Sequence, residues 1–120
     1  LYIIYISLCK SIYFIMITYY FAIASQDFLL QEEPVEEILR ERTQYYTIIN
    51  KPIDFWLIKD PSFLKKNTQE IISIKKQLTK PTAAIISQNP KFIDWIKLRL
   101  GFVLIGQFNS PVEITSNFQK

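Results

Sequence analysis

Residues 17–25 read ITYYFAIAS, a run of β-branched and aromatic side chains that is too short for a stable isolated helix. It predicts a strand buried on at least one face. Residues 82–87, TAAIIS, predict another strand, whose small alanines would let a helix approach closely. Residues 53–58, IDFWLI, are apolar on both faces except for Asp54, so they predict a central strand that is covered on each side.

Helical patterns separate and follow these strands. Residues 32–49 open on glutamates and a proline, which suit a helix N-terminus, and carry an apolar stripe. Residues 62–78 predict a short helical turn followed by an amphipathic helix, and residues 91–104 predict a last helix that begins at Asn89-Pro90. Residues 107–120 can add an edge strand but are polar enough to fray.

The order of elements is β-α-β-α-β-α in one layered domain, which by itself favours a parallel, doubly wound sheet. The only glycines are Gly101 and Gly106, so no glycine-rich turn follows the first strand. Neither a dinucleotide fingerprint nor a phosphate loop can be built.

The N-terminal 24 residues are hydrophobic enough to suggest a membrane span, but Lys10 lies near the middle and the last third alternates like a strand. No basic residue precedes the apolar run, as a signal peptide would require. We therefore interpret residues 1–15 as an extension upstream of Met16, residues 16–108 as the domain and residues 109–120 as a polar tail.

Composition limits the chemistry of this chain. The 120 residues include no histidine and one cysteine, Cys9, which excludes a usual zinc site, an internal disulfide, and Cys-His or Ser-His-Asp catalysis. An all-carboxylate magnesium site is not formally excluded. The acids that open the first predicted helix complement its dipole rather than form a catalytic cluster; they are Glu32, Glu33, Glu36 and Glu37. We expect no catalytic residue, no metal and no cofactor.

Charge is divided along the chain. Residues 16–60 carry eight acids and four bases, and residues 61–120 carry three acids and nine bases. Such a distribution can orient a docking partner, although solvated surface charge explains it equally well. A nucleic-acid interface would need these bases clustered on one face, together with an aromatic recognition motif that the sequence lacks.

Two charged residues lie within apolar patterns. Projecting the last helix at about 100° per residue places Arg99 on one face with Phe92, Trp95 and Ile96. Arg99 either extends its head to solvent, pairs with a buried acid, or belongs to an aromatic-plus-arginine site for a partner. Asp54 must likewise be paired, lie at an edge, or serve binding, and a pair with Arg99 would satisfy both.

Several blocks of this sequence resemble one known family over residues 18–108. The blocks are Tyr19-Tyr20-Phe21-Ala22-Ile23-Ala24-Ser25, Phe28-Leu29-Leu30, Glu32-Glu33-Pro34, Leu39-Arg40-Glu41-Arg42, Ile53-Asp54-Phe55-Trp56-Leu57, Pro81 with Ala83-Ala84-Ile85-Ile86-Ser87, and Phe92-Ile93-Asp94-Trp95-Ile96-Lys97-Leu98-Arg99-Leu100. The family is the hypothetical chloroplast reading frame family numbered fifty-four. Its pattern differs here in the N-terminal extension and in Thr82, which replaces a small residue.

The resemblance implies an α+β fold, a single layered domain whose four-stranded, mainly antiparallel sheet is flanked by three or more helices. It also implies a non-catalytic accessory subunit that binds and stabilises the di-iron catalytic subunit of the oxygen-dependent magnesium-protoporphyrin IX monomethyl ester cyclase of chlorophyll biosynthesis. By resemblance, Asp54, Phe55 and Arg99 are partner-binding positions, and Ala24 is a motif position without a defined role. The implied location is a plastid, in the stroma or peripheral to the thylakoid or envelope membrane, with membrane contact through the partner.

A tetrapyrrole carrier is the alternative function. It would use an apolar cleft formed by Tyr19, Tyr20, Phe55, Trp56 and Trp95. No histidine is available as an axial ligand. The two functions differ in whether the chain binds a protein or the pigment precursor itself.

Overall fold

The structure, a computed structural model, describes residues 16–61 and 69–110. Its elements are β1 (Ile17–Ser25), the π-helical turn η1 (Phe28–Glu32), α2 (Val35–Ile48), β2 (Phe55–Lys59), α3 (Gln69–Gln77), β3 (Thr82–Ser87), α4 (Pro90–Leu100) and β4 (Leu104–Ser110). The strands predicted at residues 17–25 and 82–87 are confirmed with these bounds. Of the remaining predictions, the extension at residues 1–15 and the helical turn within residues 62–68 lie outside the described residues.

The four strands form one sheet in the order β2-β3-β1-β4, and every neighbouring pair is antiparallel. This confirms the α+β fold, and the parallel sheet favoured by element order alone is wrong. The central position predicted for residues 53–58 is also wrong, because β2 lies at an edge of the sheet. The other edge is β4, which extends the sheet through Ser110 into the predicted polar tail.

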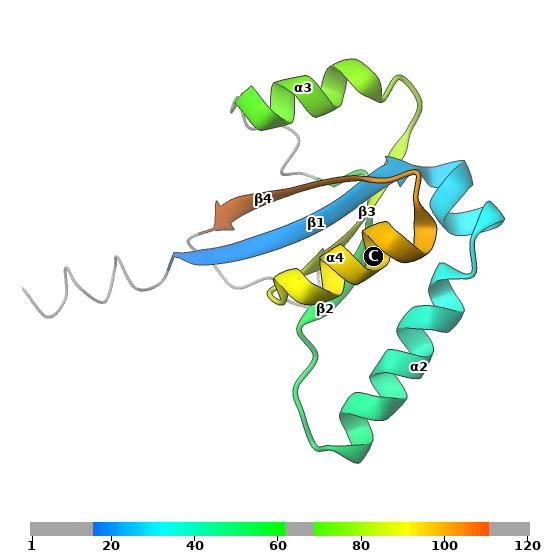
Figure 1. The fold of residues 1–120 in the computed structure, drawn as a ribbon, viewed down its shortest axis with the longest axis vertical. Coiled ribbons are helices and arrows are strands. Elements are labelled where there is room, and N and C mark those ends of the chain that lie inside the picture. The colour runs from blue at the N-terminus through cyan, green and yellow to red at the C-terminus, as the bar shows by residue number, and fades with distance from the viewer. Residues whose placement is uncertain (1–15, 62–68, 111–120) are drawn as a thin grey trace, which may run out of the picture.

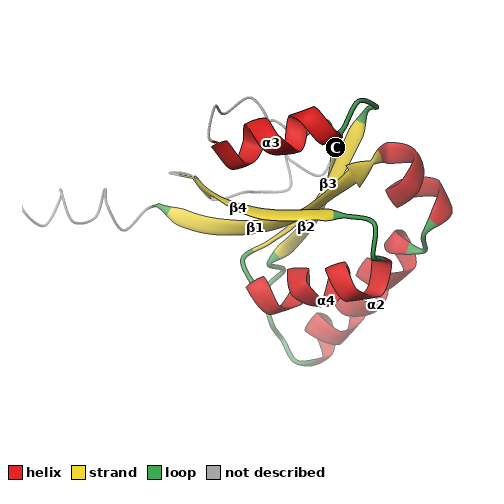
Figure 2. Cartoon of the chain, turned by 45° about the horizontal axis from the view of Figure 1, so that its top comes forward, coloured by secondary structure: helices red, strands yellow, loops and turns green. Residues whose placement is uncertain are grey.

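Helices cover both faces of the sheet. Figures 1 and 2 show α3 on one face and α2 with α4 on the other. Alternate residues of each strand enter the two cores: Phe55 of β2 faces α2 and α4, whereas Trp56 enters the core beneath α3. The alanines of β1 and β3 are divided in the same way, with Ala22, Ala24 and Ala83 on the side of α2 and α4. The helix that the small residues were expected to admit is α4, which packs on this face of the sheet.

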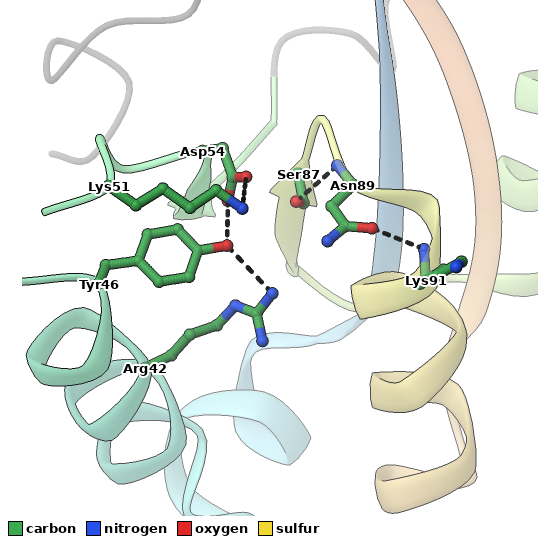
Figure 3. A network of polar contacts seen from close by, with 7 residues as sticks. All are labelled: Arg42, Tyr46, Lys51, Asp54, Ser87, Asn89 and Lys91. Carbon is green, nitrogen blue, oxygen red and sulfur yellow. Dashed lines mark hydrogen bonds and ion pairs between the residues drawn. The ribbon is translucent and has the colours of Figure 1, made fainter. Parts of the chain in front are cut away.

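Local signals determine where α4 begins and ends. Asn89 caps its N-terminus, because its side-chain oxygen accepts a hydrogen bond of 3.0 Å from the backbone N–H of Lys91 (Figure 3). The helix ends at Leu100 rather than at the predicted residue 104. Gly101 has φ of +81°, a conformation that favours glycine and cannot continue an α-helix. The residues after this turn are then available for β4.

The long helix α2 begins later than predicted, at Val35, because residues 28–32 form the separate turn η1. Its first turn still carries Glu36 and Glu37, whose charges complement the helix dipole. Val35 is buried beneath it, whereas Ile49, the last residue of the range predicted for this helix, is exposed. None of the helices within the described ranges is long and apolar enough to cross a membrane.

Candidate functional site

Arg42 extends from α2 and is enclosed by aromatic rings. Its guanidinium carbon lies 3.9 Å from the ring centroid of Phe92, 5.1 Å from that of Tyr46 and 5.7 Å from that of Phe55. These rings come from α4, α2 and β2, in that order. A cation over an aromatic face contributes about 0.5–2 kcal/mol, depending on how far it is removed from water. One cation therefore connects three elements on this side of the sheet.

A chain of polar contacts leads from Arg42 to Asp54 (Figure 3). Arg42 Nη2 donates a hydrogen bond of 3.1 Å to the hydroxyl of Tyr46, which donates one of 2.8 Å to Asp54 Oδ1. Lys51 Nζ lies 3.6 Å from Asp54 Oδ2 and 4.7 Å from the centroid of the Tyr46 ring. The charges of Arg42 and Asp54 are thus joined through a neutral hydroxyl rather than by direct contact.

The guanidinium of Arg42 has more donors than acceptors around it. Arginine carries five N–H donors, and the Tyr46 hydroxyl is the one protein acceptor that they find among the described residues. The Nε atom is buried without a partner, and no carboxylate in this part of the chain pairs with Arg42. An unmade hydrogen bond at a buried donor costs about 1–3 kcal/mol. Arg42 is thus a half-buried cation whose Nε lacks a partner and whose outer N–H donors, apart from the one bonded to Tyr46, are open to solvent or to a binding partner.

A surface depression of about 360 Å³ adjoins this cation. It is lined by Ile38, Glu41, Arg42 and Tyr45 of α2 and by Phe92 and Trp95 of α4. We call it the interhelix depression. Tyr45 and Trp95 are 57% and 47% exposed, and the rings of Trp95 and Phe92 stack with centroids 6.2 Å apart. Aromatic side chains and an arginine in one hollow are typical of protein-binding sites.

Asp54 precedes β2 and does not lie within it, which corrects the predicted strand bounds. Its side chain is 18% exposed and contacts Tyr46 and Lys51. The pair with Arg99, one of the possibilities left open by the sequence, is not formed. Both partners of Asp54 are close to it in sequence: Tyr46 belongs to α2 and Lys51 to the segment that follows α2.

Arg99 is exposed on α4 and makes no ion pair within the described residues. The predicted face is confirmed for Phe92 and Ile96, which are buried, and wrong for Trp95 and Arg99, which are exposed. The buried face of α4 consists of Phe92, Ile93, Ile96 and Leu100. Arg99 is therefore available to a partner as a surface charge, and its binding role stays a prediction.

Phe55 is only 4% exposed and belongs to the core between the sheet and α2 with α4. Its ring meets Tyr46 edge to face at 5.3 Å and lies 5.6 Å from Phe92. It also lines a second hollow of about 570 Å³ beside α2, together with Leu39 and Ile53. Phe55 thus contacts Arg42 from within the core, and its role in partner binding stays a prediction.

Ala24 is buried in β1, opposite Ala83 of β3, in the core that α4 covers. The structure gives this position a packing role. We expect Ala24→Leu to lower the free energy of unfolding by about 1–3 kcal/mol, because added side-chain volume in a close-packed core forces neighbours to move. Urea denaturation would measure the change. Gln107→Leu, at an exposed position of β4, is the matched control and should change stability little; equal losses in both variants would contradict the packing role.

The aromatic cleft proposed for a tetrapyrrole carrier is not formed. Tyr19 and Trp56 are buried together beneath α3, with ring centroids 6.2 Å apart. Phe55 lies on the opposite face of the sheet, and Trp95 is exposed on α4. Alternation along β1 and β2 separates these side chains, so they cannot line one cavity.

Potential metal ligands are scattered in the described part of the chain. No three side chains of aspartate, glutamate or cysteine come together there in a way that could hold a metal ion. The sequence contributes no histidine.

Sequence reasoning overlooked Arg42, Tyr46 and the role of Phe92 as a partner of the cation. A signal was present, since Arg42 follows Val35 by seven residues and precedes Tyr46 by four, so it shares their helix face. Arg42, and not Arg99, is the arginine that packs among aromatic side chains on an apolar helix face.

Comparison with known proteins gives a consistent match. The family model described as Ycf54 protein matches residues 17–110. A relative from Pyropia yezoensis named uncharacterized protein ycf54 is 56% identical over 100 residues, which cover 83% of this chain and 88% of the relative. An Arabidopsis thaliana relative named protein YCF54, chloroplastic, is 36% identical over 93 residues, covering 77% of this chain and 42% of the relative.

The fold is similar to solved structures as well. The structure of the Ycf54 protein from Synechocystis is 45% identical to this chain, with a TM-score of 0.75, and the match covers 88% of this chain and 96% of that one. The names of these relatives state no activity.

Proposed function

Because this chain belongs to the Ycf54 protein family, we propose that it is a non-catalytic accessory subunit of the oxygen-dependent magnesium-protoporphyrin IX monomethyl ester cyclase. In this role it binds and stabilises the di-iron catalytic subunit. Two observations support this role: the resemblance to the family, and a surface depression suited to binding a protein.

The interhelix depression is the observation that carries the binding role. Its exposed Trp95 and Tyr45 flank Arg42, and tryptophan, tyrosine and arginine are the residues in which interface binding energy concentrates. Asp54 is joined to this site through Tyr46, and Arg99 lies on the same helix as Trp95. Of the positions that the resemblance implies in partner binding, Asp54 is thus connected to this depression by hydrogen bonds, and Arg99 shares a helix with one of its lining residues.

The chemistry of the chain supports an accessory rather than a catalytic role. A di-iron centre in a helical protein is built from glutamates and histidines, and this sequence contains no histidine. The metal ligands of the cyclase would therefore come from the partner. A plastid location is part of the proposal and is supported by the Arabidopsis relative that is named chloroplastic.

The direct test is co-purification with the catalytic subunit. We expect Asp54→Ala and Arg99→Ala each to weaken binding by about threefold to tenfold, since both are partly or fully exposed charges near the proposed surface. Lys75→Ala, an exposed charge on α3 across the sheet, is the control and should bind normally. Unchanged binding in folded Asp54 and Arg99 variants would remove these residues from the interface.

A depletion experiment tests the stabilising role. Removing this protein from cells is expected to lower the abundance of the catalytic subunit while activity per remaining molecule is preserved. Normal abundance with reduced activity per molecule would contradict stabilisation.

A further inference from the structure

Within the described residues, seven of the ten large exposed apolar side chains lie on α2, on α4 or in the segments that follow these helices, whereas Met16, Ile72 and Ile105 lie elsewhere. Tyr45 and Ile48 project from α2, Trp95 and Leu98 from α4, and Phe102 follows α4. These helices lie on the same side of the sheet (Figure 2). Monomeric proteins rarely leave such a concentration uncovered, so this side is suited to a protein partner.

The interhelix depression combines exposed aromatic side chains with an arginine. Arg42 lines it with the half-buried guanidinium described above, which has one protein acceptor, the Tyr46 hydroxyl, and a buried Nε without a partner. Two planar oxygens presented together match the fork of a guanidinium better than any other common side-chain group. A carboxylate is therefore the side-chain group that would best accept hydrogen bonds from Arg42 in the depression.

Glu41 at the same hollow narrows the choice of anion. It is exposed and acidic, so it opposes a group with two negative charges more strongly than a group with one. A phosphate would also have a single arginine to neutralise it here. A singly charged carboxylate attached to an apolar group fits both Arg42 and the walls formed by Tyr45 and Trp95.

We propose that the interhelix depression binds an aspartate or glutamate side chain of the partner protein, with the carboxylate on Arg42 and an adjoining apolar residue between Tyr45 and Trp95. This inference rests on the proposed function, because it names how that partner is recognised. It assigns to Arg42 the anchoring role and to Tyr46 and Phe92 the task of holding the guanidinium in place.

The first experiment uses no partner. Phenylacetate, a carboxylate on an apolar ring, is titrated onto the ¹⁵N-labelled protein while NMR follows the side-chain Nε–H of Arg42 and the indole N–H of Trp95. We expect saturable shifts with a dissociation constant on the order of 1–10 mM. Trp56, buried on the other face of the sheet, is the internal control and should not shift.

Three controls keep this result specific. The neutral isostere phenylacetamide and inorganic phosphate should each bind at least about tenfold more weakly. Arg42→Met, which keeps an apolar stem against the rings, should abolish the phenylacetate shifts in a folded protein. Arg40→Gln removes a positive charge two residues away on an exposed position and should leave them unchanged. Absence of saturable binding to the unsubstituted protein would overturn the carboxylate site and leave the proposed accessory role untouched.

The second experiment identifies the source of the carboxylate. Arg42→Met is expected to weaken co-purification with the catalytic subunit at least about tenfold, whereas the α3 control Lys75→Ala should not. If phenylacetate binds but Arg42→Met retains normal partner binding, the carboxylate does not come from that protein and the docking inference is wrong. If the unsubstituted chain fails to bind the catalytic subunit at all, the proposed function fails, while the phenylacetate result is decided separately.

Discussion

Phe55→Ala is expected to lower the free energy of unfolding by about 3–5 kcal/mol, as removal of a buried phenylalanine side chain typically does. The ring is 4% exposed and packs against Tyr46 and Phe92. It also lies beneath the guanidinium of Arg42, so its removal leaves that cation with less aromatic surface. Urea denaturation followed by circular dichroism would measure the loss.

The same position offers a way to separate folding from binding. Phe55→Leu retains most of the apolar volume and should cost about 1–2 kcal/mol, so this variant stays folded. Normal partner binding by Phe55→Leu would mean that Phe55 acts by supporting the site. Lost binding at nearly unchanged stability would indicate a direct contact through the second hollow, and a stable Phe55→Ala variant would contradict the core position altogether.

Trp95→Ala is expected to have the opposite profile, with little change in stability and a large loss of partner binding. Trp95 is half exposed and lines the interhelix depression, so its removal uncovers little of the core. A tryptophan at the centre of an interface typically contributes at least about 2 kcal/mol, which corresponds to about a 30-fold weaker dissociation constant. Surface plasmon resonance with the immobilised catalytic subunit would measure it.

Leu98→Ala provides the matched control on the same helix. Leu98 is 86% exposed and does not line the interhelix depression. If the interface is centred on the depression, Leu98→Ala should change the dissociation constant by no more than about threefold. Equal losses in the two variants would show that binding is spread along α4, and a neutral Trp95→Ala would remove the depression from the interface.

The sequence predicts strand bounds best for the two strands whose side chains are buried on both faces of the sheet. The strands at residues 17–25 and 82–87 were predicted with the bounds that the structure has, and both are central in the sheet. The run at residues 53–58 has the same apolar character, yet β2 is an edge strand. Continuous apolar character reports what covers the two faces of a strand, and it carries no information about how many strands lie beside it.

The site could be predicted only in part, for a reason visible in α4. Apolar residues surround most of this helix, among them Ile93 and Ile96 on the buried side and Trp95 and Leu98 on the exposed side. Periodicity therefore could not determine which side faces the sheet, and the predicted stripe extended to the exposed Arg99. Asp54 stood out because it is a single acid among apolar residues, whereas Arg42 lies among charged neighbours that conceal its contact with three rings.

The register of the sheet also governs how this protein can be made. β1 is hydrogen-bonded on one side to β3 and on the other to β4, with Ser25 opposite Thr82 and Ile17 opposite Ser110. A ribosome therefore synthesises the central strand long before either of its neighbours, and pairings so distant along the chain form slowly. Until residue 87 has been added β1 has two open edges, and until residue 110 has been added one of them is still open to other nascent chains and to chaperones.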